Sequence, residues 1–69
     1  MFMIDRIDPR TEALEVWRAT EQLVSIRWDA FLQADPESRR FAFASYVAAL
    51  DAEEAASLAL WALSTRLAA

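Results

Sequence analysis

Acid–base chemistry in this chain would depend on carboxylates, because the sequence contains no His and no Cys. Glu12 and Glu15 stand near one predicted helix start, and Glu53 and Glu54 stand near another, where negative charge suits the helix dipole. The Ser hydroxyls have no imidazole base anywhere in the chain to activate them. Carboxylate di-iron bundles use Glu-x-x-His pairs, which this sequence cannot form. We therefore expect no catalysis, no metal and no cofactor.

Glu21 is the polar residue that interrupts an otherwise apolar series, and two interpretations of it remain open. In the first, the residue lies at the rim of a helix contact, and its carboxylate reaches water or an Arg such as Arg18. In the second, the carboxylate is buried, pairs with an Arg and fixes register or partner choice, as a polar core position does in coiled coils.

The stretch 8–34 is predicted to be one long helix that positions most of these residues. Asp8-Pro9 supplies an N-cap followed by the proline that is favoured at the first helical position. Asp35-Pro36 ends the helix, because proline disfavours helical geometry in the residue before it. Two series step by three and four residues along this helix: Leu14, Trp17, Glu21, Val24, Trp28 and Phe31, and Val16, Ala19, Leu23, Ile26 and Ala30.

These two seams lie on different sides of the helix, at about 100° per residue. One interpretation is a three-helix bundle in which the chain's own helices cover both seams. The other is that one seam faces the chain's own helices and the second faces another polypeptide. A chain of 69 residues can bury only a small hydrophobic core. Small domains gain stability from disulfides, metal ions or oligomerisation; without Cys there is no disulfide, without His the commonest metal ligand is missing, and oligomerisation remains.

The remaining chain is predicted to form an apolar N-terminal arm over 1–7, a second helix over 35–50 and a third over 51–67. Asp51 and Glu54 form an Asp-led variant of the capping box, which marks the break. The alternative is one unbroken helix over 36–67, which gives a two-helix hairpin that pairs as a four-helix dimer. In the second helix, the bulky stripe is the better core candidate, and the smaller stripe allows close helix approach. The bulky stripe is Phe43, Tyr46, Val47 and Leu50, and the smaller is Phe41, Ala44 and Ala48.

Composition sets the fold class and argues against several functions. Gly and Asn are absent, which disfavours tight β-hairpins, whereas Ala, Leu, Glu and Arg favour helix. The net charge of −4 argues against nucleic-acid binding, and a recognition helix made of Ala, Leu and Trp would not read a groove. No uncharged run is long enough for a membrane span. We expect an all-α, three-helix homodimer in the cytoplasm, a single domain over 1–69.

The function expected is that of a non-catalytic interaction or regulatory module. It presents apolar helix faces to itself, to a larger protein, or to both. Trp17 and Trp28 are close to three turns apart and so share a face, and Trp is enriched at interface hot spots. The predicted interface residues are Trp17, Glu21, Val24, Trp28, Phe31, Leu58 and Trp61. The alternatives are a bundle that binds a small ligand or lipid, and a regulator that contacts nucleic acid.

Overall fold

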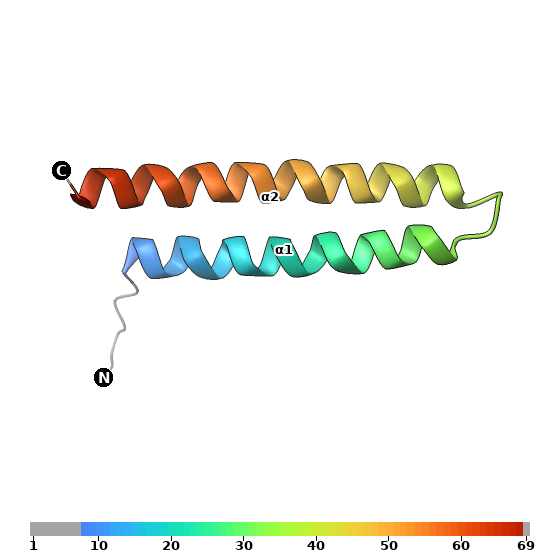
Figure 1. Ribbon diagram of the computed structural model, residues 1–69, viewed down its shortest axis with the longest axis horizontal. Coiled ribbons are helices and arrows are strands. Elements are labelled where there is room, and N and C mark those ends of the chain that lie inside the picture. Colours follow the sequence, from blue (N-terminus) through green and yellow to red (C-terminus); the bar gives the residue numbers. More distant parts are fainter. Residues whose placement is uncertain (1–7, 69) are drawn as a thin grey trace, which may run out of the picture.

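The computed structural model describes residues 8–68 of the chain, with side chains for residues 8–66. Within that part the fold consists of two α-helices, α1 (Pro9–Gln33) and α2 (Arg39–Ala68). They run antiparallel and side by side as one hairpin (Figure 1). The apolar arm predicted over 1–7 lies outside the described residues. The all-α fold class is therefore confirmed for the part of the chain that the structure describes.

Helix α1 begins and ends where the two Asp-Pro pairs predict. Pro9 occupies its first turn, and the amide of Glu12 donates to the Asp8 carbonyl at 3.0 Å. The Asp8 side chain makes no cap hydrogen bond, so the start depends on the proline and the backbone. At the other end Ala34 is extended, with φ −70° and ψ 141°. Pro36 disfavours helical geometry in Asp35, the residue directly before it, and the helix ends one residue earlier, at Gln33.

The connection between the helices is a turn over residues 34–38, and α2 begins later than predicted. The backbone amide of Ser38 donates to both the carbonyl and the carboxylate Oδ1 of Asp35, each at 3.0 Å. Asp35 thus acts as the capping residue of the turn, and Pro36 lies within the turn. The first residues after the Asp-Pro pair reverse the chain direction, which a helix starting at residue 35 could not do.

Helix α2 is continuous across Asp51, so the prediction of a three-helix bundle is wrong, and the two helices of the hairpin alternative are confirmed within the described residues. The Asp51–Glu54 capping signature is not used as a helix start. A cap satisfies amides that a preceding turn leaves free, and nothing before Asp51 removes residues from helical geometry. With neither Gly nor Pro between residues 39 and 68, uninterrupted propagation costs less than a second nucleation.

The contact between the helices follows a line of small residues on α2. Ala49 and Ala56, one heptad apart, are 3% and 9% exposed and are the buried apolar residues of the described chain. Alanine at heptad spacing lets the helix backbones approach closely, but it contributes little buried area. The bulky stripe that we expected in the core is instead largely open, with Phe43, Val47 and Leu50 between 37% and 48% exposed.

Neither α1 nor α2 has the length and hydropathy needed to cross a membrane, among the residues searched.

Candidate protein-interaction surfaces

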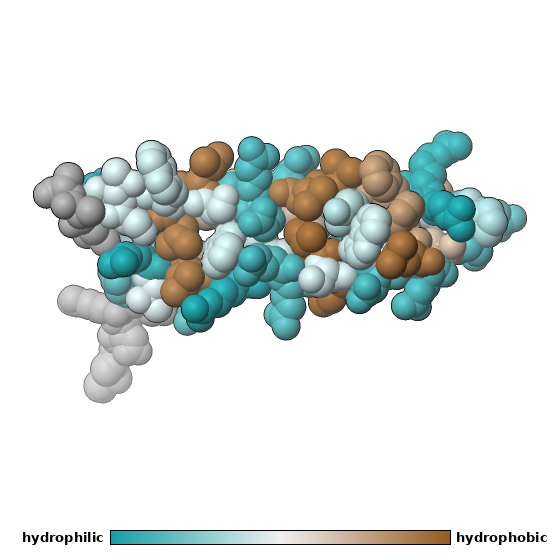
Figure 2. All heavy atoms as spheres, in the orientation of Figure 1, coloured by the Kyte–Doolittle hydropathy of each residue, from teal (hydrophilic) through white to brown (hydrophobic). Residues whose placement is uncertain are grey.

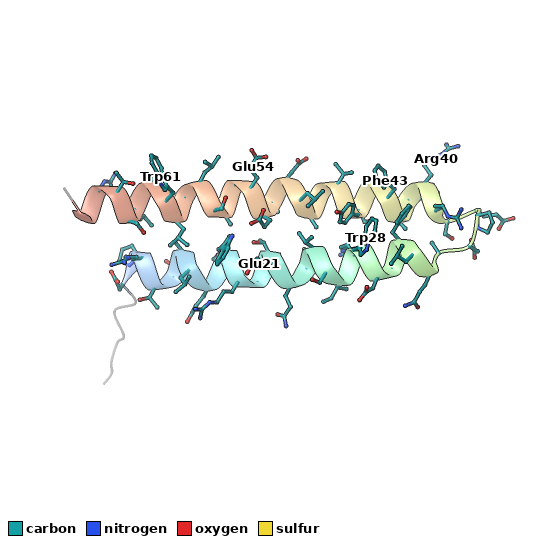
Figure 3. All side chains as sticks on the ribbon, viewed as in Figure 1. Glu21, Trp28, Arg40, Phe43, Glu54 and Trp61 are labelled. Carbon is teal, nitrogen blue, oxygen red and sulfur yellow. The ribbon has the colours of Figure 1, made fainter. Side chains whose placement is uncertain are left out.

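An aromatic cluster joins the two helices in the half of the hairpin nearest the loop. The ring centroids of Trp28 and Tyr46 are 4.9 Å apart, and those of Phe31 and Phe43 are 5.4 Å apart. Trp28 also contacts Phe31 at 5.4 Å. All these pairs are tilted, the geometry that the ring quadrupoles favour. Figure 3 shows Trp28 and Phe43 on the facing helices. The cluster fixes this end of the hairpin, yet Trp28 and Phe43 remain partly exposed.

A polar contact links the helices near their middle. The Trp17 indole Nε1–H donates to Glu53 Oε2 at 2.8 Å, and both residues are half-buried. Hydrogen bonds to a charged acceptor are stronger than neutral ones, so this contact holds α1 and α2 in register. Glu21 lies in the same region, is exposed, and lines an open groove of about 690 Å³ together with Arg18 and Glu53. In the hairpin Glu21 therefore lies at a rim, with an Arg beside it.

The groove marks one side of the hairpin, which we call the aromatic face. Leu50 lines the groove, and Phe43 lies one heptad before it, so both share this side of α2. Trp28 lies one heptad after Glu21 and so shares this side of α1. Trp61 lies eleven residues, about three turns, after Leu50. In Figure 2 apolar atoms gather near the loop and again near the chain ends, with a hydrophilic band between them.

The opposite side carries no aromatic cluster, and we call it the aliphatic face. A second groove there is lined by Val16 and Ala13 of α1 and by Ala56, Ala59 and Leu63 of α2. Steps of three, four and seven residues from Val16 and Ala59 place further residues on the same side. The face comprises Val16, Leu23, Ile26 and Ala30 of α1, and Phe41, Ser45, Ala48, Ala52, Ala59 and Leu63 of α2.

The predicted interface residues fall into three groups. Trp17, Val24 and Phe31 are half-buried and lie along the contact between the helices. Trp28 and Glu21 belong to the aromatic face. Leu58 and Trp61 are 59% and 67% exposed, and Trp61 points away from α1 in Figure 3.

Sequence reasoning missed the exposure of Phe41, Phe43 and Ile26, at 73%, 48% and 58%. The spacing of apolar residues along α1 did indicate that Ile26 lies on a second seam. No sequence signal separated Phe43 from a core residue, because its stripe is as apolar as a core stripe.

The grooves described above are open to solvent, as is a third one lined by Arg10, Leu14 and Leu60. No group of three or more His, Cys, Asp or Glu side chains that could hold a metal occurs within the searched part of the chain.

Comparison with protein-family models, with curated proteins and with solved structures finds no match to this chain.

Proposed function

We propose that this protein is a non-catalytic interaction module that presents apolar helix faces to another polypeptide. The observation that supports this proposal is the imbalance between what the hairpin buries and what it exposes. Within the described residues, the buried apolar residues are Ala49 and Ala56, whereas ten large apolar side chains are more than a third exposed. A helix pair with this pattern lacks most of a core and gains one when another helical surface covers it.

The magnitude of the exposed surface supports the same proposal. Trp28, Phe41, Phe43 and Trp61 are 40%, 73%, 48% and 67% exposed. At about 200 Å² for each aromatic side chain, they leave on the order of 450 Å² in water. Covering that area would contribute on the order of 10 kcal/mol as an upper bound. This is comparable with the whole stability of a small domain.

The proposal is tested by following the purified chain from low to high micromolar concentration. We expect sedimentation to show association with itself or, for a monomer, Trp fluorescence that acrylamide quenches readily. Quenching should decrease once a partner covers Trp28 and Trp61. A chain that stays monomeric at every concentration, unfolds cooperatively and shields all three Trp residues would refute the proposal, because no apolar face would then remain for a partner.

A small-ligand or lipid site receives less support from the described residues. The grooves open to solvent, whereas ligand pockets bury most of a small molecule's surface. The aromatic rings near the loop pack against one another, and none of them lines the three grooves described above.

A further inference from the structure

We propose that the aliphatic face binds a second copy of this chain and forms a four-helix dimer whose two loops lie at the same end. The inference rests on the proposed function and names the partner for one of the two faces. It follows from the charges on each face, from the sizes of the side chains on each helix, and from the symmetry of a dimer.

Charge decides which face accepts a second copy. Glu21 and Glu53 line the groove of the aromatic face, with Arg18 as the cation in that groove. Two aromatic faces in contact would bring four carboxylates together, and desolvating them with so few cations is unfavourable. The groove of the aliphatic face is lined by one acid, Glu12, near the chain ends. A protein of net charge −4 can therefore associate with itself through the aliphatic face at the lower electrostatic cost.

The stripe on α2 of the aliphatic face is uncharged along almost its whole length. Ser45, Ala48, Ala52 and Ala59 are all exposed to solvent in the hairpin. On α1 the corresponding residues are large, with Val16 50% and Ile26 58% exposed. The two halves of one face therefore differ in size over most of their length: α1 contributes bulky aliphatic side chains, and α2 contributes a shallow track of small residues that ends, near the loop, in the 73% exposed Phe41.

A two-fold axis parallel to the helices makes these halves complementary. Such an axis places α1 of each copy over α2 of the other and keeps every residue at its own height along the bundle. Val16 then meets Ala59 of the second copy, because both line one groove and share a height. Leu23 lies one heptad after Val16 and meets Ala52, one heptad before Ala59. Bulky residues thus fill the space above small ones on both sides, as close packing requires.

The alternative axis, perpendicular to the helices, puts the loops at opposite ends and stacks each helix on its own copy. Leu23 would then approach Leu23 of the second copy, and alanine would face alanine across α2. One side of the bundle would be wide and the other narrow. The size difference between the helices therefore favours the arrangement with both loops at the same end.

Charges at the edge of the aliphatic face also suit that arrangement. Glu12 shares a groove with Leu63, and the side chain of Arg66 leans back toward the preceding turn of α2. With α1 of one copy over α2 of the other, Glu12 and Arg66 of different copies meet at the rim. Arg27 lies two heptads after Ala13 of this groove and is exposed in the hairpin. It therefore lies on the aliphatic face, and its long side chain has to extend past the contact to keep the guanidinium in water.

The area of the face is sufficient for a stable dimer. Residues 41–63 of α2 span about 33 Å at 1.5 Å per residue, and two helices side by side are about 20 Å wide. The projected face is therefore roughly 660 Å². Side chains make the surface uneven, so the buried accessible area approaches the roughly 800 Å² per partner of a standard interface.

The test compares two neighbouring substitutions that add the same charge on different sides of α2. Ala59→Glu places a carboxylate in the proposed contact, and Leu58→Glu places one at an exposed position away from it. We expect the wild-type chain to sediment as a dimer. Ala59→Glu should weaken dimerisation by about a hundredfold or more, because each dimer would bury two unpaired carboxylates. Leu58→Glu should leave the dimer intact, and circular dichroism should show that both variants remain helical.

Cross-linking tests the arrangement in chains that carry no buried charge. Ile26→Cys combined with Ala48→Cys should give a covalent dimer on oxidation if the loops lie at the same end, because these positions face each other across copies. Leu23→Cys alone should not. A dimer linked through Leu23→Cys, with none from the double variant, would overturn the proposed arrangement.

The outcomes separate this inference from the proposed function. A dimer that Leu58→Glu disrupts and Ala59→Glu does not would overturn the aliphatic face as the contact. A wild-type chain that is monomeric with quenchable Trp residues would overturn self-association, while the interaction function would stand with a different protein as partner. A self-sufficient monomer with shielded Trp residues would refute both.

Discussion

The packing of α2 against α1 at Ala49 provides the most direct test of the hairpin. Ala49 is 3% exposed and lies where the helix backbones approach each other. Ala49→Leu adds three carbon atoms at an almost fully buried position, so the helices must separate or the new side chain must adopt a strained rotamer. Such overpacking costs about 1–3 kcal/mol. For a chain of this size that corresponds to a fall in Tm of roughly 4–24 °C.

The matched control for this substitution is Ala44→Leu. Ala44 is exposed on the outer side of the same helix, and alanine and leucine have similar helix propensities, so this variant should leave the free energy of unfolding within about 0.5 kcal/mol. Urea unfolding followed by circular dichroism, at one fixed protein concentration, measures both. If Ala49→Leu were as stable as Ala44→Leu, the close approach at Ala49 would be wrong.

Three further substitutions test the contacts that hold the two helices together. Trp17→Phe keeps most of the ring but removes the donor to Glu53, and it should cost about 1 kcal/mol in urea unfolding. Asp35→Ala removes the acceptor for the Ser38 amide at the start of α2 and should cost about 1 kcal/mol, seen as a lower Tm. Trp28→Ala opens the aromatic cluster and should cost about 2 kcal/mol, below the value for a fully buried ring because Trp28 is partly exposed. An unchanged Tm in any of these variants would show that the corresponding contact does not form in solution.

Local signals in the sequence predict the ends of α1 well, because they act within a few residues. Pro9 and Pro36 restrict the backbone whatever the rest of the chain does. The start of α2 is shifted, since Asp35 caps a turn that the chain needs in order to reverse direction. The chain has to reverse direction because α1 and α2 pack antiparallel, and the residues around Pro36 alone do not indicate this packing.

The missed continuity of α2 has a different physical cause. Asp51 and Glu54 have the residue types of a helix start, yet residue types permit a cap without requiring one. A break needs a residue that leaves helical geometry, and the alanine-rich sequence on both sides of Asp51 favours helix. Asp51 is exposed in the middle of α2, where its propensity cost of less than about 1 kcal/mol is below the cost of starting a new helix.

The candidate interaction surfaces were predictable in kind but not in position. Two seams on α1 indicate contacts on two sides, and the structure places α2 against the first seam. Trp17, Val24 and Phe31 of that seam are half-buried, while Val16 and Ile26 of the second seam remain exposed. Periodicity gives the angle between seams, but it cannot say where a neighbouring helix will lie.

The position of α2 follows from its own sequence. Its heptad line of Ala42, Ala49 and Ala56 permits a closer approach than its bulky stripe does. Using the small line for the hairpin leaves Phe43, Val47 and Leu50 of the bulky stripe partly exposed. A single neighbour cannot cover two seams that lie well over 100° apart. A second copy on the aliphatic face would cover the second seam and give α1 two neighbours. The aromatic face would then stay accessible in the dimer, so association with a copy and binding of a further protein can occur together on opposite sides of one hairpin.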